Sequence, residues 1–298
     1  LRSRPCRRSL EPHAMKLAPS STLCICLAVA ALACLAVADD SQTTVSAASQ
    51  DEQGVLVHAV LSPYQAGEAQ IRILLPDELD ATAKYPVVYV LPVEAKNEHR
   101  YGDGLLEIKQ RDLHNKHRAI FVAPTFSHLP WYADHPTDPE IRQETYFLQV
   151  VVPFIDKTYP VVAEAKGRYL LGFSKSGWGA WNLLLRHGDT FNKASAWDAP
   201  LMMERLGKYG TTGILATQEN FEPHRLDKLL RAHASELRDR SRLVLTGYDN
   251  FREHHQRAHE LLNELKIPHI YRDGPQRKHD WHSGWVAEAL EFLMSDAK

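Results

Sequence analysis

A serine surrounded by small residues is the clearest candidate for chemistry in this sequence. Residues 170–180 read LLGFSKSGWGA, in which Ser174 is the serine of a G-x-S-x-G-like pattern and Ser176 replaces the last glycine. In a nucleophile elbow the serine lies on a strained turn between a strand and a helix, so the residues two before and two after it must be small. Gly172 and Ser176 both meet this requirement. The stretch predicts Ser174 as a nucleophile, with an ordinary strand-to-helix turn as the alternative.

A serine nucleophile needs a base to take its proton and an acid to orient that base. In sheets that carry such an elbow, the chain order is serine, acid, histidine. Asp249 follows a late apolar segment, and His279 follows the last one. Each alone is more simply a turn or surface residue, but the order of the three predicts a triad of Ser174, Asp249 and His279. Asp198, which follows an earlier apolar segment, is the alternative acid.

The segments that must position these residues alternate between strand-like and helix-like patterns. Two alternating apolar segments come first, and apolar runs then alternate with amphipathic segments. This order predicts an α/β fold with a mostly parallel, doubly wound sheet, helices on both faces and antiparallel N-terminal strands, in one domain over residues 54–298. The predicted strands are 55–61, 70–75, 86–91, 119–123, 168–172, 193–197, 242–246 and 269–272. The predicted helices are 140–157, 177–186, 226–237, 252–265 and 285–294.

Three stretches of the sequence carry a resemblance to a known family. They are IRILLPDELDATAKYPVVYVLP, LLGFSKSGWGAWNLLLRHGDTF and KHDW, the last of which contains His279. The segment from about Gln70 to Leu293 resembles the Putative esterase branch of the α/β-hydrolases, which includes esterase D-like and feruloyl esterase-like enzymes and, more distantly, the mycolyltransferases. The resemblance implies an α/β-hydrolase fold, with Ser174 as nucleophile, His279 as base and Asp249 as acid.

The sequence departs from the family pattern where the oxyanion hole is expected. The family usually has His-Gly after its third strand, whereas residues 91–95 here read LPVEA. One donor should be the backbone N–H of Lys175, which any residue type supplies. Pro92 has no N–H to donate, which leaves Val93 or Glu94, and the register with the family favours the N–H of Glu94 as the second donor. Loss of one donor costs roughly 10²–10³ in rate.

Aromatic residues near the predicted strand ends are candidate substrate contacts. Trp131 and Tyr132 follow the fourth predicted strand, and Trp197 ends the sixth. Loops beyond the carboxyl ends of strands line the site in open α/β sheets, so these rings are placed to stack on a sugar or an aryl group. Packing of a lid against the body is the alternative. Lys175 beside the nucleophile either attracts an acidic substrate or lies over the helix start.

The sequence implies no metal ion and no organic cofactor. His255 and His259 are spaced i, i+4 on a predicted helix, but the segment lacks the glutamate of H-E-x-x-H. We interpret these histidines as part of a solvated polar face. All four cysteines precede Ala38, so a chain cleaved there has neither a disulfide nor a cysteine-based metal site.

The N-terminal residues predict export. Met15-Lys16 is followed by a short apolar run over residues 23–37 that ends in Ala-Val-Ala, as in a signal peptide cleaved after Ala38. The run is shorter than the ~20 residues of a spanning helix. Residues 1–38 are predicted to be leader and signal peptide, and residues 39–53 a disordered linker. Lipid anchoring at Cys34 is a minor alternative.

Charge argues against nucleic acid as a partner. The whole chain has a formal charge of −2, and removal of residues 1–38 leaves 30 basic and 36 acidic residues. The mature chain then carries a formal charge of −6 and no basic block.

Together these features predict a secreted or periplasmic serine hydrolase, most simply a carboxylesterase that works through an acyl-enzyme on a small-molecule or carbohydrate-linked ester. A non-catalytic binding protein on a hydrolase scaffold is the alternative from a different class, and an acyltransferase or peptidase of the same fold is an alternative enzyme.

Overall fold

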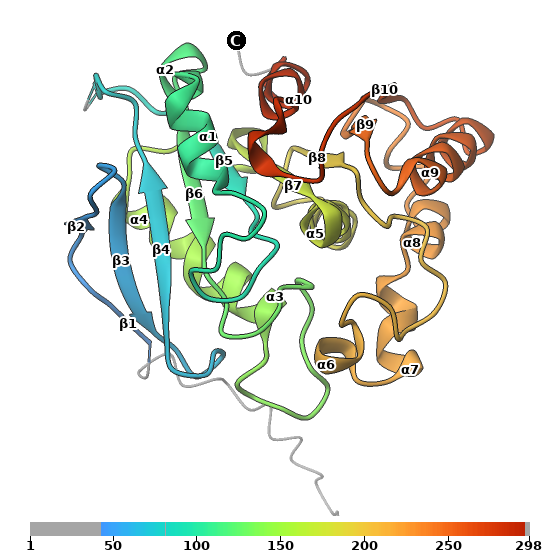
Figure 1. The fold of residues 1–298 in the computed structure, drawn as a ribbon, viewed down its shortest axis with the longest axis horizontal. Helices are drawn as coiled ribbons and strands as arrows, with labels where there is room; N and C mark the ends of the chain where they lie inside the picture. Colours follow the sequence, from blue (N-terminus) through green and yellow to red (C-terminus); the bar gives the residue numbers. More distant parts are fainter. Residues whose placement is uncertain (1–42, 81, 296–298) are drawn as a thin grey trace, which may run out of the picture. The chain divides into compact units, whose positions relative to one another are not determined.

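The computed structural model describes residues 43–80 and 82–295, which belong to one compact unit (Figure 1). The predicted signal peptide, with Cys34 and Ala38, lies outside these residues. Within the described ranges, no helix has both the length and the apolar character needed to cross a membrane.

The described strands form one mixed sheet with the order β1-β3-β4-β6-β5-β7-β8-β9-β10, and β2 also pairs with β3. Pairing is antiparallel from β1 to β6 and parallel from β6 to β10. Their bounds are Thr44–Val45 (β1), Ser49–Gln50 (β2), Leu56–Leu61 (β3), Glu68–Leu74 (β4), Val87–Val90 (β5), Ile120–Pro124 (β6), Arg168–Phe173 (β7), Lys193–Trp197 (β8), Leu243–Tyr248 (β9) and His269–Gln276 (β10).

The first two strands correct the expectation for the N-terminal linker. Thr44 and Val45 pair with Leu61 and Val60, and Ser49–Gln50 pairs with the other end of the same strand. The prediction of a disordered linker over 39–53 is therefore wrong for these residues. The reason is the free edge of β3, whose unpaired backbone groups accept further strands. The amino-acid composition of residues 39–53 does not reveal such an edge.

Helices cover both faces of the parallel region, as the continuous apolar runs predict. All four residues of β5 are buried, but they alternate between two separate clusters. Val87 and Tyr89 belong to the core cluster that includes Trp178 of α5, whereas Val88 and Val90 belong to the cluster that includes Leu290 of α10. The prediction of an α/β fold with helices on both faces is confirmed.

Most predicted helices are present, with shifted ends. The helix predicted over 140–157 consists of α3, a π-helical stretch over Phe147–Val151 and α4, while α1, α2, α6 and α7 have no counterpart among the predictions. The bounds are Gly104–Gln110 (α1), Leu113–Lys116 (α2), Gln143–Tyr146 (α3), Val152–Thr158 (α4), Ser174–Arg186 (α5), Thr212–Leu215 (α6), Gln218–Phe221 (α7), Leu226–Ala232 (α8), Arg252–Glu264 (α9) and Val286–Leu293 (α10).

Candidate active site

The elbow at Ser174 has the geometry that its sequence predicts. Strand β7 ends at Phe173 and helix α5 begins at Ser174, whose φ is +52°. Only this left-handed conformation lets the chain turn so sharply from strand to helix, and it is strained for a residue with a side chain. A Cβ on Gly172 would lie 2.3 Å from the backbone oxygen of Ser176. Gly172 is therefore required by the close approach of strand and helix.

Ser176, the departure from the glycine pattern, stabilises the turn. Its side chain is fully buried, and its hydroxyl donates to the backbone oxygen of Phe173 at 2.9 Å and accepts from the N–H of the same residue at 3.1 Å. A glycine at this position could form neither bond. The substitution therefore adds two hydrogen bonds to the residue that precedes the nucleophile.

The imidazole of His279 is bound by Asp198. Its Nδ1 lies 2.6 Å from Oδ2 of Asp198, which is completely buried at the end of β8. Oδ1 of Asp198 accepts from the N–H groups of Asn250 at 2.9 Å and Phe251 at 2.7 Å. The main chain of Asp198 also contacts the elbow, because its carbonyl accepts from the N–H of Ser174 at 3.1 Å.

The electrostatics keep Asp198 ionised. Burial by itself would raise the pKa of this carboxyl, but the hydrogen bond from His279 and those from the backbone of residues 249–251 outweigh burial and lower the pKa below its usual value. A carboxylate in this position fixes the imidazole tautomer and favours the imidazolium form.

Asp249, the acid expected from the sequence, lies elsewhere. Its Oδ2 accepts from the backbone N–H of His279 at 3.0 Å, and its Oδ1 accepts from the side chain of Gln276 at 3.2 Å. The carboxylate thus braces the histidine loop rather than the imidazole. The order β7-β8-β9 gives the physical reason, because β8 lies beside the strand that carries the nucleophile. Asp198, with a φ of +40°, turns from the end of β8 toward the ring.

Aromatic rings hold the imidazole from several sides. Tyr101 meets it edge-on at 5.4 Å between ring centroids, Phe173 at 5.0 Å, and Phe251 lies tilted at 5.9 Å. Beneath this layer Trp197 is stacked on Trp285 at 5.3 Å. The predicted substrate contact at Trp197 is therefore wrong, because its ring is buried as a support for the histidine loop.

Ser174 and His279 line the same cleft, which has a volume of about 570 Å³. The predicted contact Trp131 lines it too. Tyr132 does not, because its hydroxyl donates to the backbone oxygen of Pro92 at 2.6 Å and its ring fills the space over Gly179. The other lining residues are Arg100, Tyr101, Leu129, Lys175, Pro200, Tyr209, Gly210, Asn250 and Phe251. Sequence analysis missed Tyr101 and Phe251, although Phe251 closely follows Asp249.

The carboxylate of Glu94, in the loop over residues 92–95, is bound by residues 100 and 101. The Glu94 side chain is buried, with Oε2 accepting from the N–H of Tyr101 at 3.1 Å and Oε1 lying 3.4 Å from the guanidinium of Arg100. Among the described residues, no acceptor binds the backbone N–H of Glu94 or Lys175. Both amides are therefore free to donate to a ligand.

Two cationic side chains, Lys175 and Arg100, line the cleft near Glu94. Lys175 is half-buried, and burial lowers the pKa of its ammonium group, while Glu94 opposes the shift and Arg100 adds to it. The cleft is lined by Lys175 and Arg100, and none of its lining residues is an aspartate or a glutamate. This side of the cleft thus favours ligands with a negative charge.

A buried histidine supports the loop that carries Asp198. His255 is almost fully buried, and its Nε2 accepts from the N–H of Ala199 at 2.8 Å. Burial lowers its pKa to about 4, so the ring is neutral at physiological pH and keeps a lone pair for this bond. The interpretation of His255 as part of a solvated face is wrong. His259 contacts His269 instead, with 2.7 Å between Nδ1 and Nε2.

Comparison with known proteins places this site in a family. Residues 62–246 match the family model described as Putative esterase, which is more than half of the chain. The chain therefore belongs to the Putative esterase family, and the predicted resemblance to that family is confirmed.

A curated relative is also an esterase, and solved structures share the fold of this chain. The chain is 28% identical to Esterase Rv1288 of Mycobacterium tuberculosis over 139 residues, or 45% of this chain and 30% of the relative. It thus spans about a third of that relative's length. Two solved structures share the α/β-hydrolase fold. A ferulic acid esterase matches with a TM-score of 0.63 at 20% identity, covering 85% of this chain and 97% of the other. The Staphylococcus aureus fluorophosphonate-binding serine hydrolase FphF matches with a TM-score of 0.65 at 14% identity, covering 84% and 100%.

Proposed function

We propose that this protein is a serine carboxylesterase with Ser174 as nucleophile, His279 as base and Asp198 as acid. The observation that carries the proposal is the elbow at Ser174, which opens on the same cleft as a histidine whose Nδ1 is bound by a buried carboxylate. Family membership gives independent support, since the matched family is one of esterases.

In the proposed reaction, Nε2 of His279 takes the proton of Ser174 as its Oγ attacks the ester carbonyl. The imidazolium that forms is stabilised by Asp198, which stays ionised because its pKa is lowered. His279 then gives the proton to the leaving alcohol, and an acyl group remains on Ser174. Water, activated by the same histidine, hydrolyses this acyl-enzyme.

The negative charge on the carbonyl oxygen needs donors that are already in place. We assign this role to the backbone N–H groups of Lys175 and Glu94, both of which lack a partner within the described part of the chain. The Glu94 carboxylate does not oppose the charge directly, because its oxygens face Tyr101 and Arg100.

The walls of the cleft suggest the class of ester. Tyr209 and Phe251 line the cleft with accessible aromatic rings suited to an aryl or sugar group, whereas the Trp131 ring is fully buried, and Arg100 and Lys175 add positive charge without a lining carboxylate. We therefore propose esters that carry a carboxylate or another anionic group close to the scissile bond.

A fluorophosphonate probe with mass spectrometry tests the proposal, because it labels only an activated serine. We expect one adduct, on Ser174, in the purified protein and none in Ser174→Ala. Activity on 4-nitrophenyl acetate should disappear in the same variant. If the folded protein forms no adduct and hydrolyses no ester, it is a non-catalytic binding protein on this scaffold. If added alcohols capture the acyl group faster than water does, it is an acyltransferase.

We also propose export by a signal peptide cleaved after Ala38, on the basis of the apolar run and the Ala-Val-Ala end of the N-terminal segment. N-terminal sequencing of the protein recovered from the cell exterior or the periplasm tests this, with Asp39 expected as the first residue. A product that retains the leader, or a lipid-modified Cys34, would contradict it.

A further inference from the structure

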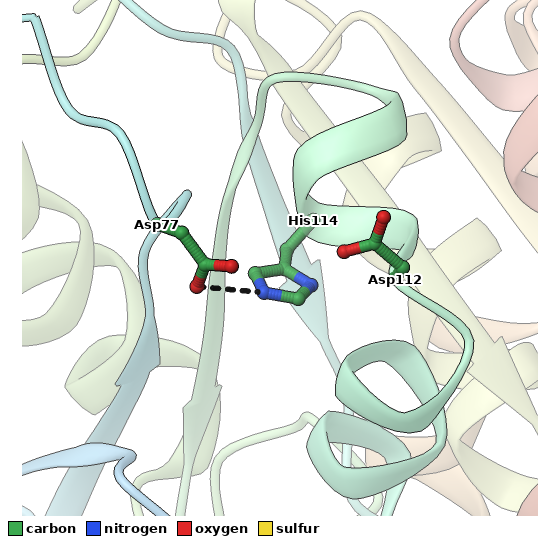
Figure 2. A group of neighbouring side chains, drawn as sticks. All are labelled: Asp77, Asp112 and His114. Atoms are coloured by element: carbon green, nitrogen blue, oxygen red, sulfur yellow. Dashed lines mark ion pairs between the residues drawn. The ribbon is translucent and has the colours of Figure 1, made fainter.

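A cluster of possible metal ligands lies far from the catalytic loops. It consists of Asp77, Asp112 and His114, whose potential ligand atoms all lie within 4.8 Å of one another. Figure 2 shows the His114 ring between the two carboxylates. Asp77 belongs to the loop that follows β4, and the other two residues stand at the start of α2.

His114 is the unusual member of this cluster. Its side chain is 3% exposed, yet among the described residues neither of its ring nitrogens has a hydrogen-bond partner. A buried polar group without a partner is rare and costs free energy. Nε2 makes one ion-pair contact, with Oδ1 of Asp77 at 3.4 Å. A cation between the imidazole and the carboxylates would satisfy one of these two buried nitrogens.

Asn115 fixes the two carboxylates beside this ring. Its Nδ2 donates to Oδ2 of Asp77 at 2.8 Å and to Oδ1 of Asp112 at 2.6 Å, while its own oxygen accepts from the N–H of Asp77 at 2.9 Å. One oxygen of each carboxylate remains for a ligand. Asp112 makes no capping bond to α2, so its carboxylate is not needed for the helix. Residues that orient ligands in this way are common around metal ions.

The distance between His114 Nε2 and Asp77 Oδ1 suits a small divalent cation. In a tetrahedral site with ligand bonds of about 2.1 Å, two ligand atoms are about 3.4 Å apart, which is the separation between His114 and Asp77. A nitrogen ligand favours a transition metal over Mg²⁺ or Ca²⁺, and two carboxylates balance its charge. We propose that Asp77, Asp112 and His114 form a Zn²⁺ site, with water as the remaining ligand.

The place of the site in the fold gives it a structural role. Asp77 follows the carboxyl end of β4, which runs antiparallel to β6, and α2 precedes the amino end of β6. Both segments therefore lie at the opposite end of the sheet from Ser174 and His279, which follow carboxyl ends of parallel strands. A bound Zn²⁺ would tie the loop after β4 to α2 without entering the reaction.

Calorimetric titration of the chelator-treated, tag-free protein with Zn²⁺ tests the proposal. We expect one Zn²⁺ per chain, a rise of a few degrees in the unfolding midpoint at saturation, and unchanged hydrolysis of 4-nitrophenyl acetate. In the Asp77→Asn/Asp112→Asn double variant, affinity should fall at least tenfold, because two anionic ligands are lost while both exposed side chains keep their size.

Two matched controls keep the outcome unambiguous. Asp80→Asn changes a carboxylate in the same loop outside the cluster and should bind Zn²⁺ as tightly as the wild type. His259→Asn removes the competing pair of His259 and His269 and should also leave binding intact. The proposal is overturned if the folded wild type binds no Zn²⁺, if the double variant binds as tightly as the wild type, or if His259→Asn abolishes binding.

Discussion

The two sides of the proposed catalytic cleft differ in how their charges are paired. We call the side with Asp198 the acid wall, and the side with Glu94, Lys175 and Arg100 the oxyanion wall. On the acid wall, the Asp198 carboxylate accepts from the ring of His279 and from the backbone of Asn250 and Phe251. On the oxyanion wall, Oε1 of the buried Glu94 lacks a hydrogen bond within the described residues, and two cations stand beside it. Both carboxylate oxygens of the first wall are hydrogen-bonded, and the second wall carries charge that is only partly balanced. We infer that both walls contribute to the rate, the first through the acid and the second through its backbone donors, and that the charge of the second also selects the substrate.

The largest expected effect separates the two aspartates of the acid wall. Asp198→Asn should lower kcat/KM on 4-nitrophenyl acetate by about 10⁴, because the amide favours the wrong imidazole tautomer. Asp249→Asn should cost about tenfold or less, since this carboxylate contacts His279 through its backbone N–H and not through its imidazole. Circular dichroism establishes that both variants are folded. The opposite ranking would restore Asp249 as the acid.

The next prediction concerns the donor on the oxyanion wall. Glu94→Pro removes the backbone N–H and should lower kcat by roughly 10²–10³. Glu94→Gln keeps the N–H and removes only the charge, so its kcat on a neutral ester should stay close to that of the wild type. Equal losses in the two folded variants would place the second donor outside residue 94.

Behind the acid wall, His255 makes stability depend on pH. Its pKa is about 4 in the folded protein and about 6.5 in an unfolded chain. Between pH 4 and 6.5, therefore, the ring binds a proton only in the unfolded state. The contribution of His255 to the free energy of unfolding is full above pH 6.5 and is lost as the pH falls toward 4. The loss is about 3 kcal/mol. Urea unfolding at several pH values should show a shallower dependence for His255→Gln, and an unchanged slope would rule out this origin.

The smallest effect tests the charge of the oxyanion wall. The wild type should hydrolyse mono-4-nitrophenyl succinate with a higher kcat/KM than 4-nitrophenyl acetate. Replacement of Lys175 by methionine should lower that ratio about fivefold, as expected for one partly exposed charge, and Arg100→Met should act in the same direction. The ratio is measured within each variant, so a general loss of rate cancels. If the wild type hydrolyses both esters with the same kcat/KM, the proposal of an anionic substrate is wrong, but the proposal of an esterase still holds.

Much of the site follows from local sequence. The elbow was predictable because its steric demands fall on neighbours such as Gly172 and Ser176, and His279 follows the last strand in a recognisable motif. The carboxylate that binds the imidazole was not predictable from local sequence, because Asp198 and Asp249 both follow apolar strands. Tyr132 was also misassigned, because its contact with Pro92 joins residues forty positions apart.

By itself, the sequence determined the alternation of strands and helices, the elbow and the order of the catalytic groups, because these depend on periodicity and on contacts within a few residues. Only the tertiary structure decided which aspartate faces His279, which aromatic rings line the cleft and how Asp77 comes to lie beside His114. Those choices depend on the order of strands across the sheet and on the turns at their ends. Both bring together side chains from distant parts of the chain, and no local pattern encodes that proximity.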